Sequence, residues 1–263
     1  MRVEEIILCF FVYGFVGWCT EVTFSAIKRR KFVNRGFLNG PICPIYGFGI
    51  LSVILILADY QDNIIKLYCM SAIVVTLLEW ITGVVLEKLF HHKWWDYSNE
   101  PFNIQGHICL PFSLAWGIAC VIVIRYVHPF TLKWIRFIPD VLEPMIIMIV
   151  LVAFIADVYV TVHEICKLNV KLKKMQDLAV EMEEFSVRIG EKLSENVIST
   201  VEKQEMMKKK LEEKYQEQFS NLSYTNKRLL RAFPRMESLK YKKQLQAIKE
   251  YLAKKKLKKN YEA

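Results

Sequence analysis

The segment Gly17-Trp18-Cys19-Thr20-Glu21-Val22-Thr23-Phe24 ends one strongly apolar stretch, and its pattern returns 66 residues later in Gly83-Val84-Val85-Leu86-Glu87-Lys88-Leu89-Phe90. Over ranges 17–43 and 83–109 this offset gives 6 identities, where about 2 are expected from ordinary residue frequencies. They are Gly17/Gly83, Glu21/Glu87, Phe24/Phe90, Gly40/Gly106, Ile42/Ile108 and Cys43/Cys109. The repeat predicts two helical hairpins that cross a membrane in the same sense, an arrangement that several transporters use to build a site between their halves.

Five apolar stretches are long enough to cross a membrane. Hydrophobic residues make up 53% of the 263 residues, although the last third is very polar. A spanning helix needs about 20 apolar residues for roughly 30 Å of hydrocarbon. The first stretch lacks the basic start and the cleavage site of a signal peptide. We therefore predict an all-α membrane protein with five transmembrane helices, a 2+2 tandem repeat plus one, over 5–27, 41–59, 65–90, 107–127 and 141–163.

The positive charges of the loops predict the orientation in the membrane, because basic loops stay on the cytoplasmic side. The loop after the first stretch carries five basic residues, Lys28, Arg29, Arg30, Lys31 and Arg35, and the next loop has a single lysine. The fourth loop, with three basic residues, is the exception. The pattern favours an outside N-terminus and a cytoplasmic C-terminal tail in the cell membrane.

Residues 167–263 are predicted to form a basic, helical tail, separate from a transmembrane domain over 1–166. The tail carries 24 Lys+Arg against 14 Asp+Glu, whereas the first 166 residues carry 12 against 13. From Leu168 to Leu193 its apolar residues recur at alternating four- and three-residue spacings, which is typical of a coiled coil. Pro234 is expected to end a helix.

Three interpretations of this tail remain open. It could be a solvated stalk, a surface for self-association or for a partner helix, or a segment that binds anionic lipid through its lysines. Nucleic-acid binding is not expected, because no recognised binding module surrounds the basic residues.

Four carboxylates lie inside predicted spans and point to a polar site. An ionised carboxylate is costly at the bilayer centre, so these side chains are expected to face one another, the bundle interior or a cavity. The loops before the second and fourth spans are rich in Gly, Pro and carboxamide residues, which suits irregular backbone buried in protein. A structural role and a ligand or ion site both remain open. The predicted site near the inner leaflet contains Glu21, Asn39, Gly40, Glu79, Glu87, Trp95, Asp96, Tyr97, Asn103, Gly106, His107 and Asp157.

Sequence motifs for enzymes and cofactors are lacking. There is no Gly-rich phosphate loop, no Gly-x-Ser-x-Gly elbow and no Cys-x-x-Cys pair. The histidines at 91, 92 and 107 have no familiar metal-site spacing. We therefore predict no catalytic residue, no cofactor and no metal.

The loops before the second and fourth predicted spans resemble those of a bacterial family of membrane proteins, the ABC-transporter permeases of the CmpB type. The resemblance covers roughly residues 8–165. It rests on Gly17-Trp18 with Glu21, on Asn34-Arg35-Gly36-Phe37-Leu38-Asn39-Gly40-Pro41 through Tyr46-Gly47, on Glu79-Trp80, and on Trp95-Asp96-Tyr97-Ser98 with Asn103 and Gly106. Arg231-Ala232-Phe233-Pro234 is similar to the tails of some members. The resemblance implies transport powered by a separate ATPase subunit.

Three functions follow as hypotheses. The first is a transport component embedded in the lipid bilayer, whose carboxylates neutralise a cationic or polar solute or relay protons. The second is a membrane-bound enzyme acting on a lipid-linked substrate, with Asp96 and His107 as candidates for acid–base catalysis. The third is a membrane scaffold that recruits partners through its basic tail.

Overall fold

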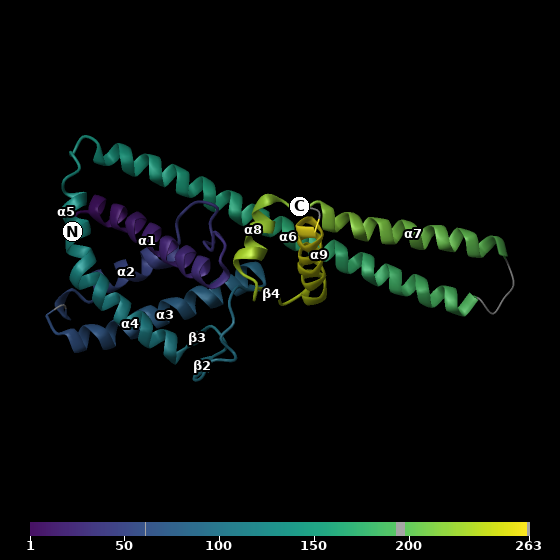
Figure 1. The fold of residues 1–263 in the computed structure, drawn as a ribbon, viewed down its shortest axis with the longest axis horizontal. Helices are drawn as coiled ribbons and strands as arrows, with labels where there is room; N and C mark the ends of the chain where they lie inside the picture. The colour runs from purple at the N-terminus through teal and green to yellow at the C-terminus, as the bar shows by residue number, and fades with distance from the viewer. Residues whose placement is uncertain (61, 193–197, 262–263) are drawn as a thin grey trace. The chain divides into compact units, whose positions relative to one another are not determined.

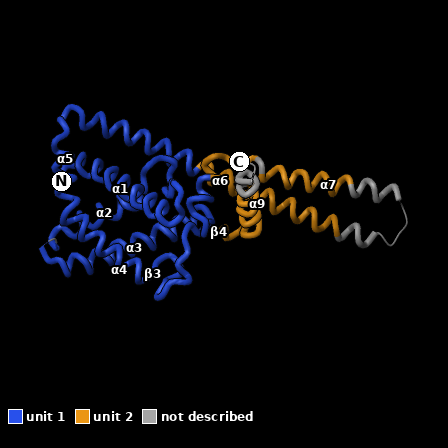
Figure 2. Tube along the Cα trace, in the orientation of Figure 1, with its two compact units in different colours: residues 1–162, 228–236 blue, residues 163–227, 237–263 orange. Residues whose placement is uncertain are grey.

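The computed structural model describes residues 1–60, 62–192 and 198–261, and the chain divides into two units (Figure 1, Figure 2). The first unit comprises Met1–Val162 and Arg228–Met236, and the second comprises His163–Lys227 and Glu237–Ala263. The first unit thus ends close to the predicted boundary at 166. It also takes in the short segment 228–236, which the sequence analysis assigns to the tail.

The described chain is mostly helical, with four strands of two residues each. The first unit contains α1 (Val3–Arg29), α2 (Pro44–Ile56), a 3-10 turn (Ala58–Tyr60), α3 (Ile64–Phe90), β1 (His92–Lys93), β2 (Asn103–Ile104), β3 (Ile108–Cys109), α4 (Leu110–Ile122), a π-helical turn (Val123–Val127) and α5 (His128–Ile135). The long helix α6 (Glu143–Lys192) begins in this unit and continues into the second. The other elements are α7 (Ile198–Ser220), α8 (Tyr224–Ala232), β4 (Glu237–Ser238) and α9 (Lys242–Tyr261).

Four of the described helical segments are long and apolar enough to cross a membrane: Val3–Arg29, Ile64–Phe90, Leu110–Ile135 and Glu143–Ser186. They match four of the five predicted spans. The remaining stretch, predicted over 41–59, is the shorter apolar helix α2 of 13 residues. At 1.5 Å per residue it is about 20 Å long, less than a hydrocarbon core. It starts late because Pro44 occupies the first helical turn, where its fixed backbone angle and missing N–H suit a helix start.

The first four main helices form two hairpins. Helix α1 packs along α2, and α3 packs along α4. The second helix of each hairpin has 13 residues. Each follows a cysteine whose backbone is extended, Cys43 before α2 and Cys109 before α4. Their bounds, Pro44–Ile56 and Leu110–Ile122, are separated by the same 66 residues as the sequence identities.

A glycine brings α1 and α2 into close contact. A methyl group added at Gly17 would lie 2.2 Å from Cγ of Tyr46, a separation at which the ring or the helices must move. In the second hairpin, a methyl group on Gly83 would lie 2.9 Å from Nδ1 of His107. In both hairpins the glycine leaves room for a side chain of the following segment.

Polar contacts tie the N-terminal end of the first unit to the segment before α6. Arg2 pairs with Glu143 at 3.1 Å, and Arg136 donates from Nε to Glu5 at 2.7 Å. Figure 1 shows the N-terminus, the turn between α2 and α3, and α5 at this same end of the unit. The apolar core nearby includes Leu8, Tyr13, Leu67 and Ile124. Buried Tyr13 shares a 2.5 Å hydrogen bond with Nδ1 of His128.

The second unit is built from the end of α6 together with α7, the start of α8, and α9. The predicted coiled-coil pattern from Leu168 to Leu193 is buried only in its first part. Leu168, Leu172 and Met175 are almost fully buried, whereas Ser186, a later position of the same spacing, is exposed. The side chains at 189 and 193 lie outside the described residues. Lys171 donates to the carbonyl of Asn221 at 2.5 Å, where α7 has ended. Helix α8 stops two residues before Pro234, as predicted.

We expect Gly17→Ala to lower the free energy of unfolding, by about 1–3 kcal/mol, because the added methyl group overpacks the contact with Tyr46. Thermal melts of the detergent-solubilised protein measure this. Gly49→Ala is the matched control, since the structure has open space at that position. It should leave the melting temperature unchanged or raise it, because Ala favours a helix more than Gly does. Equal melting of both variants would contradict the contact.

Candidate functional site

Asp157 of α6 holds the turn at Asn39 and Gly40. Its Oδ1 accepts the backbone N–H of Asn39 at 3.0 Å, and its Oδ2 accepts that of Gly40 at 2.6 Å. The Asn39 side chain donates to Oδ1 of Asp157 and to Oγ1 of Thr161, both at 3.1 Å. Thr161 lies one helical turn beyond Asp157, so both oxygens face the loop. Three of the predicted site residues therefore meet here, and the carboxylate satisfies backbone donors that no helix or strand would pair.

Arg228 completes the hydrogen bonding of the same loop from the other side. Its Nη1 donates to the carbonyl of Gly36 at 2.7 Å, Nη2 to that of Phe37 at 2.9 Å, and Nε to Oδ1 of Asn39 at 3.1 Å. The side chain is buried, with 7% exposed. A planar guanidinium with several fixed donors is suited to such a task, and a lysine could not reproduce it. No sequence signal in the membrane part indicates this residue.

Glu21 of α1 is held by two residues of the first hairpin. The Tyr46 hydroxyl donates to its Oε1 at 2.7 Å, and Nη1 of Arg35 lies 3.4 Å from its Oε2. The Glu21 side chain is 27% exposed. The carboxylate thus has both a neutral and a charged partner.

Glu79 of α3 is the most deeply buried of the predicted acids, with 6% exposed. The hydroxyl of Tyr97 donates to its Oε1 at 3.3 Å. Its Oε2 is buried and has no hydrogen-bond partner within the part of the chain that the structure describes. A buried acceptor with spare capacity is unusual, because native structures pair nearly all such groups.

Helix α4 brings the two carboxylate–tyrosine pairs together. The ring of Tyr46 meets Trp116 edge-on at 5.6 Å, and the ring of Tyr97 stacks on Phe112 at 4.9 Å. Phe112 and Trp116 are one helical turn apart on α4, so they lie on the same face. We call Glu21, Tyr46, Glu79, Tyr97, Phe112 and Trp116 the acid–tyrosine cluster.

Glu87 has a separate partner. Its Oε2 lies 3.3 Å from Nε2 of His107, and the carbonyl of His107 accepts the indole N–H of Trp95 at 2.8 Å. Three predicted site residues therefore meet in this second group. Although Glu21 and Glu87 match in the repeat, Glu21 binds a tyrosine and an arginine, whereas Glu87 binds a histidine.

Asp96, Asn103 and Gly106 shape the loop between α3 and α4. Asp96 accepts from the hydroxyl of Ser98 at 2.5 Å, and Asn103 donates to the carbonyls at 98 and 100. Gly106 has φ of 69°, and its carbonyl accepts the N–H of Tyr97 at 2.9 Å. Positive φ favours glycine. The loop thus orients Tyr97 toward Glu79.

The Asp96 carboxyl is ionised at neutral pH. Its hydrogen bond with Ser98 and the ammonium group of Lys93 lower the pKa of Asp96 to about 2. A general acid needs a pKa near the working pH. The same holds for a general base, so this environment does not favour Asp96 as the acid–base group of the enzyme hypothesis.

The structure therefore distributes the predicted residues over four neighbourhoods. The sequence analysis missed Arg35, Tyr46 and Arg228, which supply partners to Glu21 and Asn39, and the two aromatic residues of α4. Arg35 lies in the loop that the sequence marks as unusual, and Tyr46 lies just after it in the first turn of α2, so both could have been proposed. Nothing local to Arg228 indicates its contacts, which lie about 190 residues away along the chain.

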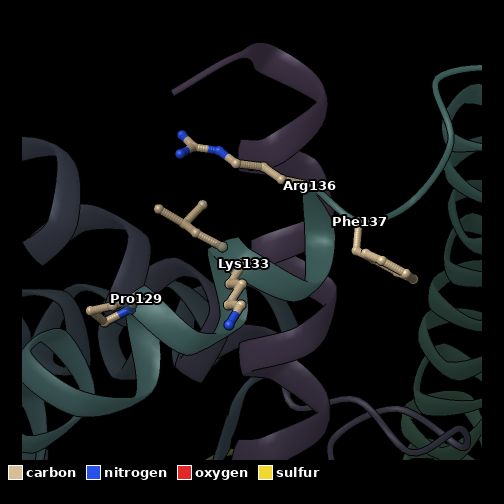
Figure 3. A pocket seen from close by; sticks show the side chains of 5 residues that line it. Pro129, Lys133, Arg136 and Phe137 are labelled. Atoms are coloured by element: carbon tan, nitrogen blue, oxygen red, sulfur yellow. The ribbon is translucent and has the colours of Figure 1, made fainter.

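A shallow hollow beside α5 contains none of the predicted residues. It is lined by Pro129, Leu132, Lys133, Arg136 and Phe137 (Figure 3). Figure 3 shows the side chains of Lys133 and Arg136 pointing in different directions, so they do not converge on one point. Over residues 1–60, 62–192 and 198–261, no three His, Cys, Asp or Glu side chains are grouped as metal ligands would be.

Comparison with known proteins identifies a family. A family model described as "Putative ABC-transporter type IV" matches residues 8–162. No curated protein and no solved structure matches the chain. The matched range agrees with the resemblance seen in the sequence and contains the whole acid–tyrosine cluster.

We expect Asp157→Asn to loosen the loop, because the amide replaces one carboxylate oxygen with a donor and leaves one backbone N–H unpaired, at about 1–3 kcal/mol. Trypsin cleavage after Arg35 in the purified protein should become faster. Asp177→Asn, at an exposed position of the same helix, is the matched control and should not change the rate. An unchanged rate in Asp157→Asn would mean that the carboxylate does not hold the loop.

Proposed function

This chain belongs to the ABC-transporter type IV family, and we propose that it is the membrane-spanning component of a transporter whose polar site is the acid–tyrosine cluster. The family and the four long apolar helices make it a membrane-integral, transport-related protein. The proposal adds the site, the topology and the source of energy.

The observation that carries the proposal is the buried Glu79 carboxylate, one oxygen of which has no hydrogen-bond partner among the described residues. Membrane proteins rarely retain an ionisable side chain inside a span unless it serves a pathway or a ligand. Glu21 contributes a second carboxylate to the cluster, and the stacked rings of Tyr97 and Phe112 lie beside Glu79. Two carboxylates and aromatic faces favour a cation or a protonated amine over an anion.

Proton transfer is the other chemistry that the cluster supports. Each carboxylate accepts from a tyrosine hydroxyl, and hydroxyl–carboxylate pairs can pass a proton between them. Entry of a cationic solute would then accompany deprotonation of Glu79. Binding of a cation alone or of a proton alone changes the net charge of the cluster, whereas exchange of a proton for a monovalent cation keeps the net charge and replaces the proton by a larger group. In each case the surroundings of Glu79 change, which gives the helices a reason to rearrange.

The repeat supports a site between two related halves. Each half consists of a long helix, a non-helical loop and a returning helix of 13 residues that follows a cysteine. We propose that the two hairpins are related by an axis normal to the membrane. The cluster draws Glu21 and Tyr46 from the first half and Glu79 and Tyr97 from the second.

We propose the five-segment topology, with the N-terminus outside and the C-terminal tail in the cytoplasm. In support, α2 leads from the loop that Asp157 holds toward the opposite end of the first unit (Figure 1), where Arg125 donates to the carbonyl of Asp62 at 3.4 Å. The short helix α2 would therefore count as a crossing segment. The polar site would lie near the inner leaflet, close to the basic first loop.

Single cysteines in a cysteine-free version test this topology. Asp59→Cys should react with a membrane-impermeant maleimide added to intact cells, because the turn between α2 and α3 is outside in the proposal. Lys31→Cys should react only after the membrane is opened. Both positions are exposed, so burial does not account for a difference. The reverse pattern, or both cysteines reacting from the same side, would refute the five-segment topology.

A separate ATPase subunit is the proposed energy source. The chain has no phosphate-binding loop of its own. Purification in mild detergent should retain an ATPase subunit with the full-length protein. Recovery of the chain without one, under conditions that preserve other membrane complexes, would count against this part of the proposal.

The scaffold hypothesis is the alternative function. The second unit has its own buried residues, including Leu168, Leu172 and Met175 of α6 and Ile248 of α9, so part of the predicted coiled-coil pattern is already covered in the chain. A scaffold would work without the acid–tyrosine cluster, and a transporter would not. The following substitutions therefore distinguish the two.

We expect Glu79→Gln and Glu21→Gln to abolish transport while the protein stays folded. Glutamine keeps an acceptor for the tyrosine but removes the charge and the exchangeable acid. The readout is the intracellular level of solutes that differ between a deletion strain and the same strain carrying the wild-type chain. Glu4→Gln, exposed at the start of α1, is the control and should restore the wild-type profile. Full complementation by the Glu21/Glu79 double variant would reject the proposed site.

A further inference from the structure

A short segment of the tail belongs structurally to the membrane domain. Residues 228–236 are part of the first unit, although the chain on both sides of them belongs to the second. Leu229, Ala232 and Met236 are almost fully buried. The segment overlaps Arg231-Ala232-Phe233-Pro234, which the proposed function does not use.

One end of this segment contacts the loop between α1 and α2. Arg228 donates to the carbonyls of Gly36 and Phe37 and to the side chain of Asn39. The residue just before this contact is Arg35, which pairs with Glu21. Arg228 therefore fixes the backbone that carries one partner of the first carboxylate.

The other end contacts the loop between α3 and α4. The ring of Phe233 meets Trp94 edge-on at 5.3 Å, and Arg235 donates to the carbonyl of Asp96 at 3.2 Å. The next residue is Tyr97, which donates to Glu79. This end therefore lies beside the partner of the second carboxylate.

The loop between α1 and α2 and the loop between α3 and α4 also contact each other beside residues 228–236. The ring of Phe37 lies 5.1 Å from that of Trp94, and the segment contacts both residues, through Arg228 at the Phe37 carbonyl and through Phe233 at the Trp94 ring. Trp94 is 3% exposed. Arg228 thus binds one member of the contact between the loops, Phe37, and Phe233 binds the other, Trp94.

We propose that residues 228–236 form a clasp that holds the two loops together and positions Arg35 and Tyr97 against Glu21 and Glu79. Because both ends of the clasp continue into the helices of the second unit, a change in that unit can release or seat it. The clasp makes the tail a regulator of the polar site. This inference does not depend on what the cluster binds, and it would hold for a scaffold as well.

A clasp and two independent contacts predict different behaviour. If one rigid segment holds both loops, then loss of either Arg228 or Phe233 should loosen both. If each side chain only packs locally, loss of Arg228 should loosen the first loop alone, and loss of Phe233 the second alone. Buried thiols already report on each loop, since Cys43 ends the first and Cys109 the second, with 5% and 1% exposed.

The experiment measures maleimide labelling of the full-length protein in membranes, with one native cysteine retained at a time. Labelling of a buried thiol requires local opening. Arg228→Ala and Phe233→Ala should each accelerate labelling of both Cys43 and Cys109, by about tenfold or more, because the first leaves buried carbonyls unpaired and the second leaves a cavity beside Trp94. Arg231→Ala is the matched control. It is an exposed arginine of the same segment that contributes its carbonyl to Arg29, so both rates should stay unchanged.

Cys120, buried at 3% in the apolar core, reports on unfolding and should not change in any variant. If it does, Arg228→Lys and Phe233→Leu replace the alanine variants, and the same comparison of the two thiols decides. Acceleration of Cys43 only by the Arg228 variant and of Cys109 only by the Phe233 variant would overturn the clasp. So would unchanged rates at both thiols. Neither result depends on transport, so the clasp and the proposed function can fail separately.

Discussion

A loop that forms neither helix nor strand must still pair its backbone N–H and C=O groups, and the loop between α1 and α2 does so through two distant charged side chains. Asp157 accepts the N–H groups of Asn39 and Gly40, and Arg228 donates to the carbonyls of Gly36 and Phe37. Unpaired backbone groups away from water are costly. Two opposite charges bound to one loop satisfy both kinds of group. The position of this loop sets where Arg35 and Tyr46 lie, and thus the surroundings of Glu21.

Glu21, Glu79 and Glu87 all lie in long apolar helices, but each has different hydrogen-bond and charge partners. Glu21 has a tyrosine and an arginine, Glu79 has a tyrosine and one unpaired oxygen, and Glu87 has a histidine. An arginine beside a carboxylate stabilises its charged form, whereas burial with few partners disfavours it. The cluster thus combines one acid that has an arginine and a tyrosine as partners with one whose single partner among the described residues is a tyrosine hydroxyl. Such unequal pairs are well suited to binding a cation or accepting a proton.

The basic tail is not a uniform appendage. Most of it belongs to the second unit, but the clasp segment contributes Arg228 to the hydrogen bonding of the membrane domain. The excess of lysine and arginine in the tail therefore has more than one role. Arg228 is buried and fully engaged with the loop, whereas Lys208 to Lys210 are exposed on α7. Exposed lysines are the ones available to anionic lipid or to an acidic partner.

The sequence by itself determined the membrane character, the family, four long apolar helices and the presence of carboxylates within them, because each of these follows from local composition or from a repeat at constant spacing. It also marked the two loops as irregular. It did not determine which partner each acid has. Glu21 and Glu87 match in the repeat, yet their partners differ, because the residues that match Tyr46 and Arg35 in the second half are Phe112 and Pro101, which cannot take their place.

Only the tertiary structure decided the short length of α2, the packing of Tyr46 and Tyr97, the partners of Glu21 and Glu79, against α4, and the placement of Arg228. The contact between Asn39 and Asp157 spans 118 residues of sequence, and that between Asn39 and Arg228 spans 189. No periodic pattern encodes such pairs. They form because a loop with unpaired backbone groups takes the charged side chains that helix packing brings within reach.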